Sequence, residues 1–221
     1  MKILETRLYQ HIDLLVLRYP QLAVTRDCIV EAYRILEEAY THEGKLLVAG
    51  NGGSAADAEH IVGELMKGFY LKRPFPEEKR TAIAAQTESL LPGTAELLQQ
   101  ALPAIDLTQH GALSTAVQND LEPLLTAAQQ VAGYGKPGDV VLGISTSGNA
   151  KNVALAVGVA KALGLSTIGL TGGSGGQLKE LCDCAIIAPA HTPADVQEYH
   201  LPIYHTLCAM LEEKFFGETE K

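Results

Sequence analysis

Five short runs of apolar residues recur along the chain. They are KLLVAG (45–50), LPAIDL (102–107), DVVLGI (139–144), LSTIGL (165–170) and CAIIAP (184–189). Unbroken apolar runs of this kind are typical of strands that are buried on both faces of a parallel sheet. We therefore expect five strands in a parallel sheet.

Elsewhere, apolar residues return at spacings of three and four, which is the period of an amphipathic helix. The pattern predicts helices over 4–17, 24–40, 54–68, 111–131, 149–163 and 194–216. The fourth of these could be interrupted between Asp120 and Pro123. Strands that alternate with helices of ten or more residues indicate βαβ units, with helices on both faces of the sheet. The expected fold class is α/β, with a doubly wound parallel sheet.

Two segments stand outside this alternation. Residues 1–43 precede the first strand, and their pattern predicts an N-terminal extension of two helices that packs in a bundle or between subunits. Residues 76–101 favour helix on both sides of Pro92–Gly93. They predict a surface hairpin of two short helices or, alternatively, a lid over the site. Because no repeat or low-complexity linker separates these parts, we expect a single domain over 1–221.

The charge balance of the chain is acidic. Its 221 residues carry 17 Lys and Arg against 26 Asp and Glu, a formal net charge of −9, so we expect no nucleic-acid or acidic-membrane partner. No apolar run reaches the roughly 18 residues of a membrane span, and the first residues do not resemble a secretory leader. Four cysteines without a C-x-x-C pair fit a reducing compartment, and we expect a cytoplasmic protein.

The first candidate site is the sequence GNGGS, which follows the first predicted strand directly. Open α/β sheets bind ligands at the carboxyl ends of their strands. Gly52 and Gly53 would let backbone N–H groups approach an anion at the start of the next helix. Gly50, Gly52 and Ala55 also match a dinucleotide fingerprint, but the acidic strand end that should follow is missing, so NAD is not expected. Alternatively, the glycines only form a tight turn.

The second candidate site is Ser145-Thr146-Ser147-Gly148-Asn149, again between a buried strand and a helix. Three consecutive hydroxyl groups and the free amides of a helix start would form a phosphate-binding loop without a lysine. The loop lacks the Gly-Lys-Ser/Thr of a nucleotide-binding P-loop, so ATP chemistry is not expected. Ordinary helix capping would explain one hydroxyl group rather than three.

Polar residues at helical spacings form a third candidate site. His60 and Glu64 are four residues apart and therefore share one face of their predicted helix. Such a pair can bind a metal or hold a carboxylate base in place. Gln197 and His205 are eight residues apart on the last helix and lie within about 80° of each other around its axis. Alone, each pair could equally be structural, and His200 is a decoy or a supporting residue.

These stretches together resemble the SIS (sugar isomerase) fold, a flavodoxin-like three-layer arrangement. Within it they are most similar to the phosphoheptose isomerase family, which converts sedoheptulose 7-phosphate to an aldoheptose 7-phosphate. The stretches that carry the resemblance are AGNGGSAADAEHIVGEL (49–65), LPAIDLTQHGALSTAVQND (102–120), GDVVLGISTSGNAKNVALAV (138–157), LTGGSGG (170–176) and VQEYHLPIYH (196–205). The sequence ISTSGN marks SIS domains in general, whereas the two polar pairs match the family's active isomerases.

The resemblance implies a role for each candidate residue. Glu64 is the implied general base and His205 the implied general acid of an aldose–ketose isomerisation through an enediol. A Zn²⁺ ion would be held by His60, Glu64, Gln197 and His205 and would polarise the carbonyl oxygen. The implied substrate and phosphate contacts are Asn51, Gly52, Gly53, Ser54, Asp120, Ser145, Thr146, Ser147, Asn149 and Gln197. The family also implies a homotetramer whose N-terminal helices form a central bundle.

The chain departs from the family pattern in three places. Ala150 stands where a serine is common, Lys67 places a basic group one position early, and 76–101 is an insertion. These differences concern substrate specificity, so an isomerase of another phosphosugar is an alternative. A non-catalytic SIS protein that binds a protein partner is a second alternative, but such relatives lack the acid/base pair that Glu64 and His205 supply.

Overall fold

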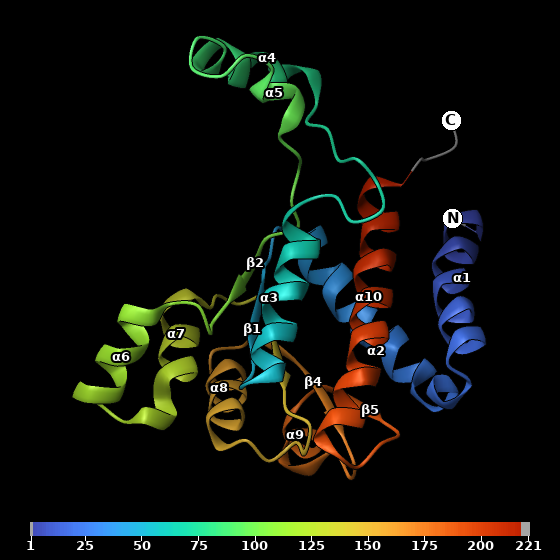
Figure 1. The fold of residues 1–221 in the computed structure, drawn as a ribbon, viewed down its shortest axis with the longest axis vertical. Coiled ribbons are helices and arrows are strands. Elements are labelled where there is room, and N and C mark those ends of the chain that lie inside the picture. The colour runs from blue at the N-terminus through green and yellow to red at the C-terminus, as the bar shows by residue number, and fades with distance from the viewer. Residues whose placement is uncertain (1, 218–221) are drawn as a thin grey trace.

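The computed structural model describes residues 2–217 and contains a five-stranded parallel sheet with helices on both faces (Figure 1). Residue 1 and residues 218–221 of the expected domain lie outside the described residues. The strand order is β2 (Ala104–Asp106), β1 (Leu46–Ala49), β3 (Val140–Ile144), β4 (Ser166–Gly172) and β5 (Cys184–Ala188). This is the flavodoxin-like order, so the predicted fold class is confirmed.

The sheet separates two apolar cores, because successive side chains of a strand point to opposite faces. In β1, Leu46 and Val48 belong to one core, whereas Leu47 and Ala49 belong to the other. Every residue of β1 and β3 is buried. Burial on both faces explains why these strands have unbroken apolar sequences.

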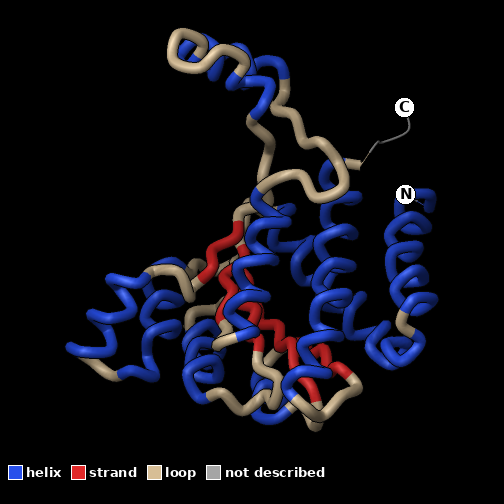
Figure 2. Tube along the Cα trace, viewed as in Figure 1, coloured by secondary structure: helices blue, strands red, loops and turns tan. Residues whose placement is uncertain are grey.

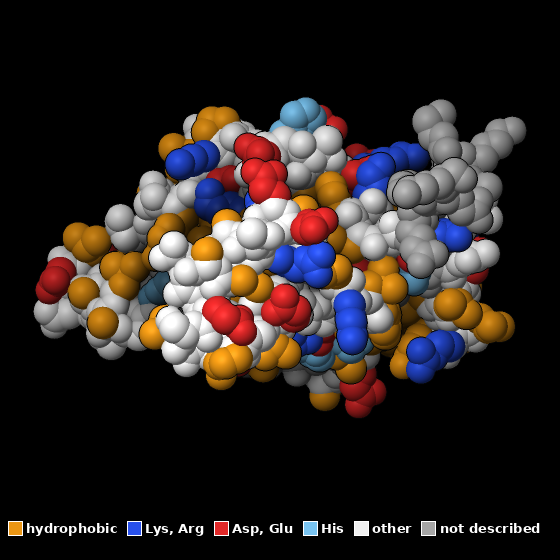
Figure 3. All heavy atoms as spheres, turned by 90° about the horizontal axis from the view of Figure 1, so that it is seen from above, with side chains coloured by type: hydrophobic (Ala, Val, Ile, Leu, Met, Phe, Trp, Pro, Cys, Tyr) orange, Lys and Arg blue, Asp and Glu red, His pale blue; other side chains and the backbone are white. Residues whose placement is uncertain are grey.

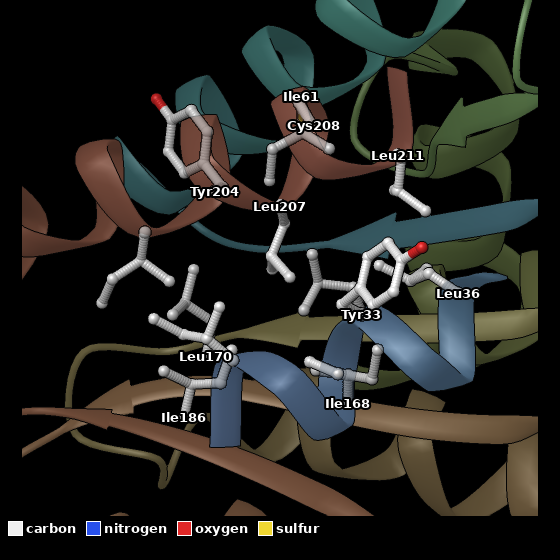
Figure 4. Packing of buried hydrophobic residues seen from close by; sticks show 14 of the residues in the cluster. Tyr33, Leu36, Ile61, Ile168, Leu170, Ile186, Tyr204, Leu207, Cys208 and Leu211 are labelled. Carbon is white, nitrogen blue, oxygen red and sulfur yellow. The ribbon is translucent and has the colours of Figure 1, made fainter. Parts of the chain in front are cut away.

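One face of the sheet is covered by α2 (Arg26–Thr41), α3 (Gly53–Met66) and α10 (Pro193–Phe216). Helix α1 (Lys2–Arg18) packs on α10, and a 3-10 turn (Pro20–Thr25) joins it to α2. Figure 4 shows how side chains of α2, α3 and α10 meet those of β4 and β5 in this core. The pair formed by α3 and α10 is important for function, because these two helices carry the polar pairs of the sequence.

The other face is covered by α7 (Thr126–Tyr134), α8 (Lys151–Ala162) and α9 (Gly176–Leu181), and α6 (Gly111–Asp120) and a 3-10 turn (Pro123–Leu125) pack on the outside of α7. The helix predicted over 111–131 is therefore broken where the sequence suggested. Glu122 has an extended backbone, with φ −146° and ψ 125°, as expected for a residue before proline. Among the described residues, no helix combines the length and apolar character that crossing a bilayer would need.

The inserted segment forms an arm that extends from the body of the protein (Figures 1 and 2). It contains α4 (Glu77–Thr87) and α5 (Thr94–Leu97), so the prediction of two short helices is confirmed. Every residue of α4 is exposed or half-buried, and Figure 3 shows charged and apolar side chains interspersed at this end of the molecule. The arm lies at the end of α3 opposite to the GNGGS loop (Figure 1). Within one chain the arm therefore lies away from the two loops at the strand ends, and a lid over the rest of the site stays a prediction.

Candidate functional site

The two glycine- and serine-rich loops lie side by side at the carboxyl ends of neighbouring strands. Strands β1 and β3 pair in parallel, and the chain leaves them toward opposite faces of the sheet. The amides of Asn51 and Asn152 exchange two hydrogen bonds of 2.9 and 2.8 Å and so join the two loops. This is the topological switch point, where doubly wound folds bind their ligands.

The first loop is shaped by three glycines, two of which have no room for a Cβ and one of which has a positive φ. A Cβ on Gly50 would lie 2.3 Å from the carbonyl oxygen of Ser54, and Gly52 has a positive φ of 55°. A Cβ on Gly53 would lie 2.4 Å from Nε2 of Gln197. The first turn of α3 therefore packs closely against the N-terminal part of α10.

The second loop is held by its own hydroxyl groups and by a close glycine contact. Ser145 is buried, and its Oγ accepts a hydrogen bond from the amide of Ala150 at 3.4 Å. The Oγ of exposed Ser147 accepts from the amide of Asn149 at 3.3 Å. Gly148, with φ 69°, leaves no space for a Cβ, which would lie 1.9 Å from the carbonyl oxygen of Gly175. The LTGGSGG stretch thus supports the loop from behind.

The structure brings together His60, Glu64 and His205, which we call the polar trio. Nε2 of His60 lies 3.1 Å from Oε1 of Glu64 and 3.4 Å from Nε2 of His205. One ligand atom from each residue falls within 4.8 Å of the others. Ligand atoms around a tetrahedral Zn²⁺ ion lie roughly 3.3 Å apart, because Zn–N and Zn–O distances are about 2.0–2.2 Å. The two separations from Nε2 of His60 are close to this value, so the trio is a candidate metal site.

A partly buried hydrogen-bond chain orients the His60 ring. The Tyr204 hydroxyl group lies 3.0 Å from Nδ1 of His60 and donates to Oδ1 of Asp57 at 3.3 Å. Since a carboxylate can only accept a hydrogen bond, the Tyr204 hydroxyl group donates to Asp57 and accepts a hydrogen bond from the Nδ1–H group of His60. The lone pair of Nε2 is then directed at Glu64 and His205. The Nε2 lone pair of neutral His60 thus faces the Glu64 carboxylate, an arrangement that a proton or a metal cation between the two groups would stabilise.

The electrostatic surroundings of the trio keep His205 neutral at neutral pH. Burial lowers the pKa of His205, the neighbouring His60 lowers it further, and Glu64 opposes both. Burial also raises the pKa of Asp57, against the hydrogen bond from Tyr204. Lys67 is near the trio as well, with Nζ 3.8 Å from Oε2 of Glu64. The two oxygens of Glu64 therefore face different partners.

His200 is fully buried and belongs to the support of the trio. Its Nε2 donates to the carbonyl oxygen of Thr171 at 3.1 Å, and its Nδ1 lies 3.9 Å from Oδ2 of Asp57. Burial lowers the pKa of His200 to about 4. Neutral His200 therefore links α10 to β4 and also faces the carboxylate that orients Tyr204.

Two predicted site residues lie away from the trio. Gln197 precedes His205 by eight residues, about 12 Å along the helix axis, and its amide lies against Gly53. Asp120 ends α6 on the surface, where Asn119 donates a hydrogen bond of 2.8 Å to its Oδ1. Gln197 is thus close to the first loop in this structure.

Sequence reasoning missed Asp57 and Tyr204. Asp57 precedes His60 by three residues and shares its helix face, and Tyr204 is adjacent to His205 in the sequence. Helical spacing could have identified Asp57. Only the packing of α3 on α10 shows that Tyr204 reaches it.

Comparison with known proteins shows the family to which the chain is related. The SIS domain family model matches residues 118–212. The phosphoheptose isomerase of Geotalea daltonii is 40% identical over 190 residues, covering 86% of this chain and 85% of the relative. That of Clostridium acetobutylicum is 39% identical over 184 residues, covering 83% and 81%. A solved phosphoheptose isomerase structure from Francisella tularensis has a TM-score of 0.73 at 29% identity, covering 94% of this chain and 97% of that one.

The identity to these relatives extends over most of both chains, and the fold agrees with the solved structure. On these grounds the chain belongs to the phosphoheptose isomerase family of SIS-domain proteins.

Proposed function

We propose that this chain is an aldose–ketose isomerase that converts sedoheptulose 7-phosphate to D-glycero-D-manno-heptose 7-phosphate through an enediol. The observation that carries the proposal is the polar trio of a carboxylate and two imidazoles on α3 and α10. The reaction requires a group that moves a proton between two neighbouring carbons and a group that moves a proton between their oxygens. Glu64 and the neutral His205 are suited to these two tasks.

Glu64 would act on the carbon-bound proton. Its carboxylate removes a proton from C1 of the ketose, which forms the enediol, and returns a proton to C2, which forms the aldose. One oxygen, Oε1, faces His60, whereas Oε2 lies on the side of Lys67. A carboxylate arranged in this way can bind a metal through one oxygen and accept a proton on the other.

His205 would move the proton between the oxygens. Its imidazole donates to the oxygen on C2 as the enediol forms and accepts the proton of the hydroxyl group on C1. A neutral ring has one donor and one acceptor nitrogen, and the lowered pKa of His205 keeps the ring in that form. The two transfers together leave the number of atoms and electrons unchanged.

The residues that would hold Zn²⁺ are His60, Glu64 and His205, with Gln197 as the fourth ligand implied by the family. Bound there, the ion would polarise the carbonyl oxygen and stabilise the negative charge that develops on it. Gln197 would have to turn away from Gly53 to join the other three. Tyr204 and Asp57 hold His60 in the tautomer that such an ion requires.

The loops at the strand ends would bind the other end of the substrate. Ser145, Thr146, Ser147 and Asn149 present hydroxyl and amide groups to a phosphate, and the residues Asn51 to Ser54 lie beside them. Gly53 and His60 are seven residues apart on α3, about 10 Å along its axis. An extended seven-carbon chain with a terminal phosphate has a similar length. It could therefore reach the trio with its first two carbons.

We also propose the homotetramer that the family implies. The exposed side of α1 carries Leu14 and Leu17, which are 55% and 76% exposed, and such apolar residues favour a helix bundle between subunits. A pocket of about 440 Å³ between α1 and α10 is lined by Arg18, Tyr70 and His205. The trio is thus close to the surface that would meet another subunit.

The proposed function is tested by following sedoheptulose 7-phosphate by NMR with purified protein, in Zn²⁺ and after treatment with a chelator. We expect formation of the aldoheptose that depends on Zn²⁺. Five- and six-carbon ketose phosphates serve as parallel substrates. Turnover of one of these instead would favour the alternative of another phosphosugar. No turnover of any of them would contradict the proposal.

A further inference from the structure

The largest fully buried side chain of the described residues is a charged one. Arg73 is 0% exposed and Glu212 is 1% exposed, and Nε of Arg73 donates to Oε1 of Glu212 at 2.8 Å. Burying two charges costs desolvation energy that their attraction often fails to recover. The pair is therefore poorly explained by its contribution to stability alone.

Glu212 binds three successive backbone amides in the segment 67–73, which connects α3 to the arm. Its Oε1 accepts from the amide of Phe69 at 2.8 Å, and its Oε2 accepts from those of Tyr70 and Leu71 at 2.7 and 3.0 Å. With Arg73, four N–H groups satisfy the two oxygens. The carboxylate thus fixes the path of the 67–73 segment over α10.

Arg73 binds the carboxyl end of α3. Its Nη1 donates to the carbonyl oxygen of Leu65 at 2.7 Å, and its Nη2 donates to that of Glu64 at 3.1 Å. These carbonyl groups belong to the last turn of the helix, where no amide within the helix is available to them. The guanidinium also lies 4.8 Å from the centre of the Phe216 ring. Arg73 therefore caps the turn that carries Glu64.

The 67–73 segment is also in contact with the other half of the trio. The ring of Phe69 lies 5.3 Å from the ring of His205, and Tyr70 is stacked on Phe69 at 3.9 Å. Glu212 follows His205 by seven residues, two helical turns, and so lies on the same side of α10. One buried ion pair thus holds the backbone beneath Glu64 and the ring that packs against His205.

We propose that Arg73 and Glu212 are positioning residues for the isomerisation, setting the relative placement of Glu64 and His205 through the end of α3 and the Phe69 ring. Neither side chain reaches the trio itself. The kinetic part of this inference rests on the proposed function, whereas the part that concerns metal binding does not.

The test compares Glu212→Gln and Arg73→Lys with the wild-type protein. Glutamine turns one acceptor oxygen into an N–H₂ group that faces backbone donors, and it leaves the buried guanidinium without its anion. Lysine keeps the charge but loses the fork that reaches Leu65 and Glu64. We expect the affinity for Zn²⁺ and the kcat for sedoheptulose 7-phosphate to fall about tenfold or more in both variants. The KM should change little, because the phosphate loops are untouched.

Asp139→Asn is the matched control. Asp139 is 4% exposed and accepts hydrogen bonds from the amides of Lys45 and Lys136 at 2.9 and 2.8 Å, besides an ion pair with Lys45. It precedes β3 and so lies at the amino-terminal ends of the strands, whereas the loops lie at their carboxyl ends. This variant should lower the Tm as the other two do and keep wild-type Zn²⁺ affinity and kcat.

Folded Glu212→Gln and Arg73→Lys proteins with wild-type Zn²⁺ affinity and kcat would overturn the proposal and leave the pair a purely structural role. If neither variant folds, Phe69→Leu decides in the same way, because it removes only the half-buried ring against His205. If the wild type does not turn over sedoheptulose 7-phosphate, the proposed function fails, but the Zn²⁺ affinities still test positioning. The ¹⁵N chemical shifts of the His205 ring test the positioning of this side chain without any ligand. Shifts that are the same in the variants as in the wild type would count against the positioning role.

Discussion

The two ends of the α3–α10 pair are built from different chemistry. At the strand end, the backbone of Gly53 lies against the Gln197 amide, and the second loop carries hydroxyl groups that bond to its own backbone amides. Two turns further along, His60, Glu64 and His205 present side-chain nitrogen and oxygen atoms to one another. Both ends lie on the same two helices.

The two ends differ in the groups that hold them in place. The loops are fixed by local backbone geometry, such as the positive φ of Gly148 and its contact with Gly175. The trio is fixed by buried side chains from other elements, including Asp57, Tyr204 and Arg73. Binding of a phosphate therefore depends on a sequence motif, whereas the trio depends on how the helices pack. Substitutions at the two ends should act on different kinetic constants.

The largest effect should follow Glu64→Gln at the trio end. Loss of the carboxylate removes the proposed base and one metal ligand, so we expect kcat to fall by about 10³-fold or more. Circular dichroism should show an unchanged fold. Glu59→Gln, an exposed position on the same helix, is the control and should keep its kcat. Activity within tenfold of wild type would place the base elsewhere.

His200 connects the trio end to the sheet, and its contribution to stability should depend on pH. Its folded-state pKa of about 4 is below the ordinary 6.5, so the unfolded chain binds the proton first. The stabilisation is complete above pH 6.5 and is lost as the pH falls toward 4. Between pH 7 and pH 5, the difference in unfolding free energy between wild type and His200→Gln should shrink by about 2 kcal/mol.

Urea unfolding of both proteins across this range measures that difference. Asp57, whose pKa is raised by burial, shifts stability in the opposite sense but is present in both proteins. A difference that does not vary with pH would show that His200 is protonated as readily in the folded state as in the unfolded state.

Tyr204→Phe should weaken the trio without touching its ligand atoms. The hydroxyl group that fixes Nδ1 of His60 is lost, while the buried ring remains. We expect the affinity for Zn²⁺ to fall about tenfold, as for other residues that orient metal ligands. Competition with a chelating dye measures it, and Tyr199→Phe on the same helix is the control. Equal affinities would mean that the Tyr204 hydroxyl group does not orient His60.

The last prediction concerns the strand end, where KM should change and kcat should not. Thr146→Val keeps the shape of the half-buried side chain and removes one hydrogen bond to the phosphate. Hydrogen bonds to charged groups contribute about 1.5–3 kcal/mol, so we expect KM to rise about tenfold or more with kcat nearly unchanged. Ser166 lies at the amino-terminal end of β4, away from the loops, so Ser166→Ala should alter neither constant. A fall in kcat alone would contradict the separation of the two ends.

The fold was predictable because apolar runs and helical spacings are local. The five strands and the break before Pro123 follow from residues close in sequence. The His60 and Glu64 pair was also predictable, because a spacing of four residues fixes their shared face. The approach of Tyr204 to Asp57, and of Phe69 to His205, depends on packing between elements far apart in sequence. The same holds for Gln197, whose spacing to His205 did not show that its amide would lie against Gly53.

The central claim is that Glu64 moves a proton between two carbons of a phosphosugar, and isomerisation in D₂O tests it most directly. With sedoheptulose 7-phosphate and Zn²⁺, an enediol route through Glu64 predicts solvent deuterium at C2 of the aldose in wild type, and loss of both exchange and product in Glu64→Gln. Exchange or product formation that persists near the wild-type rate in Glu64→Gln would contradict the account.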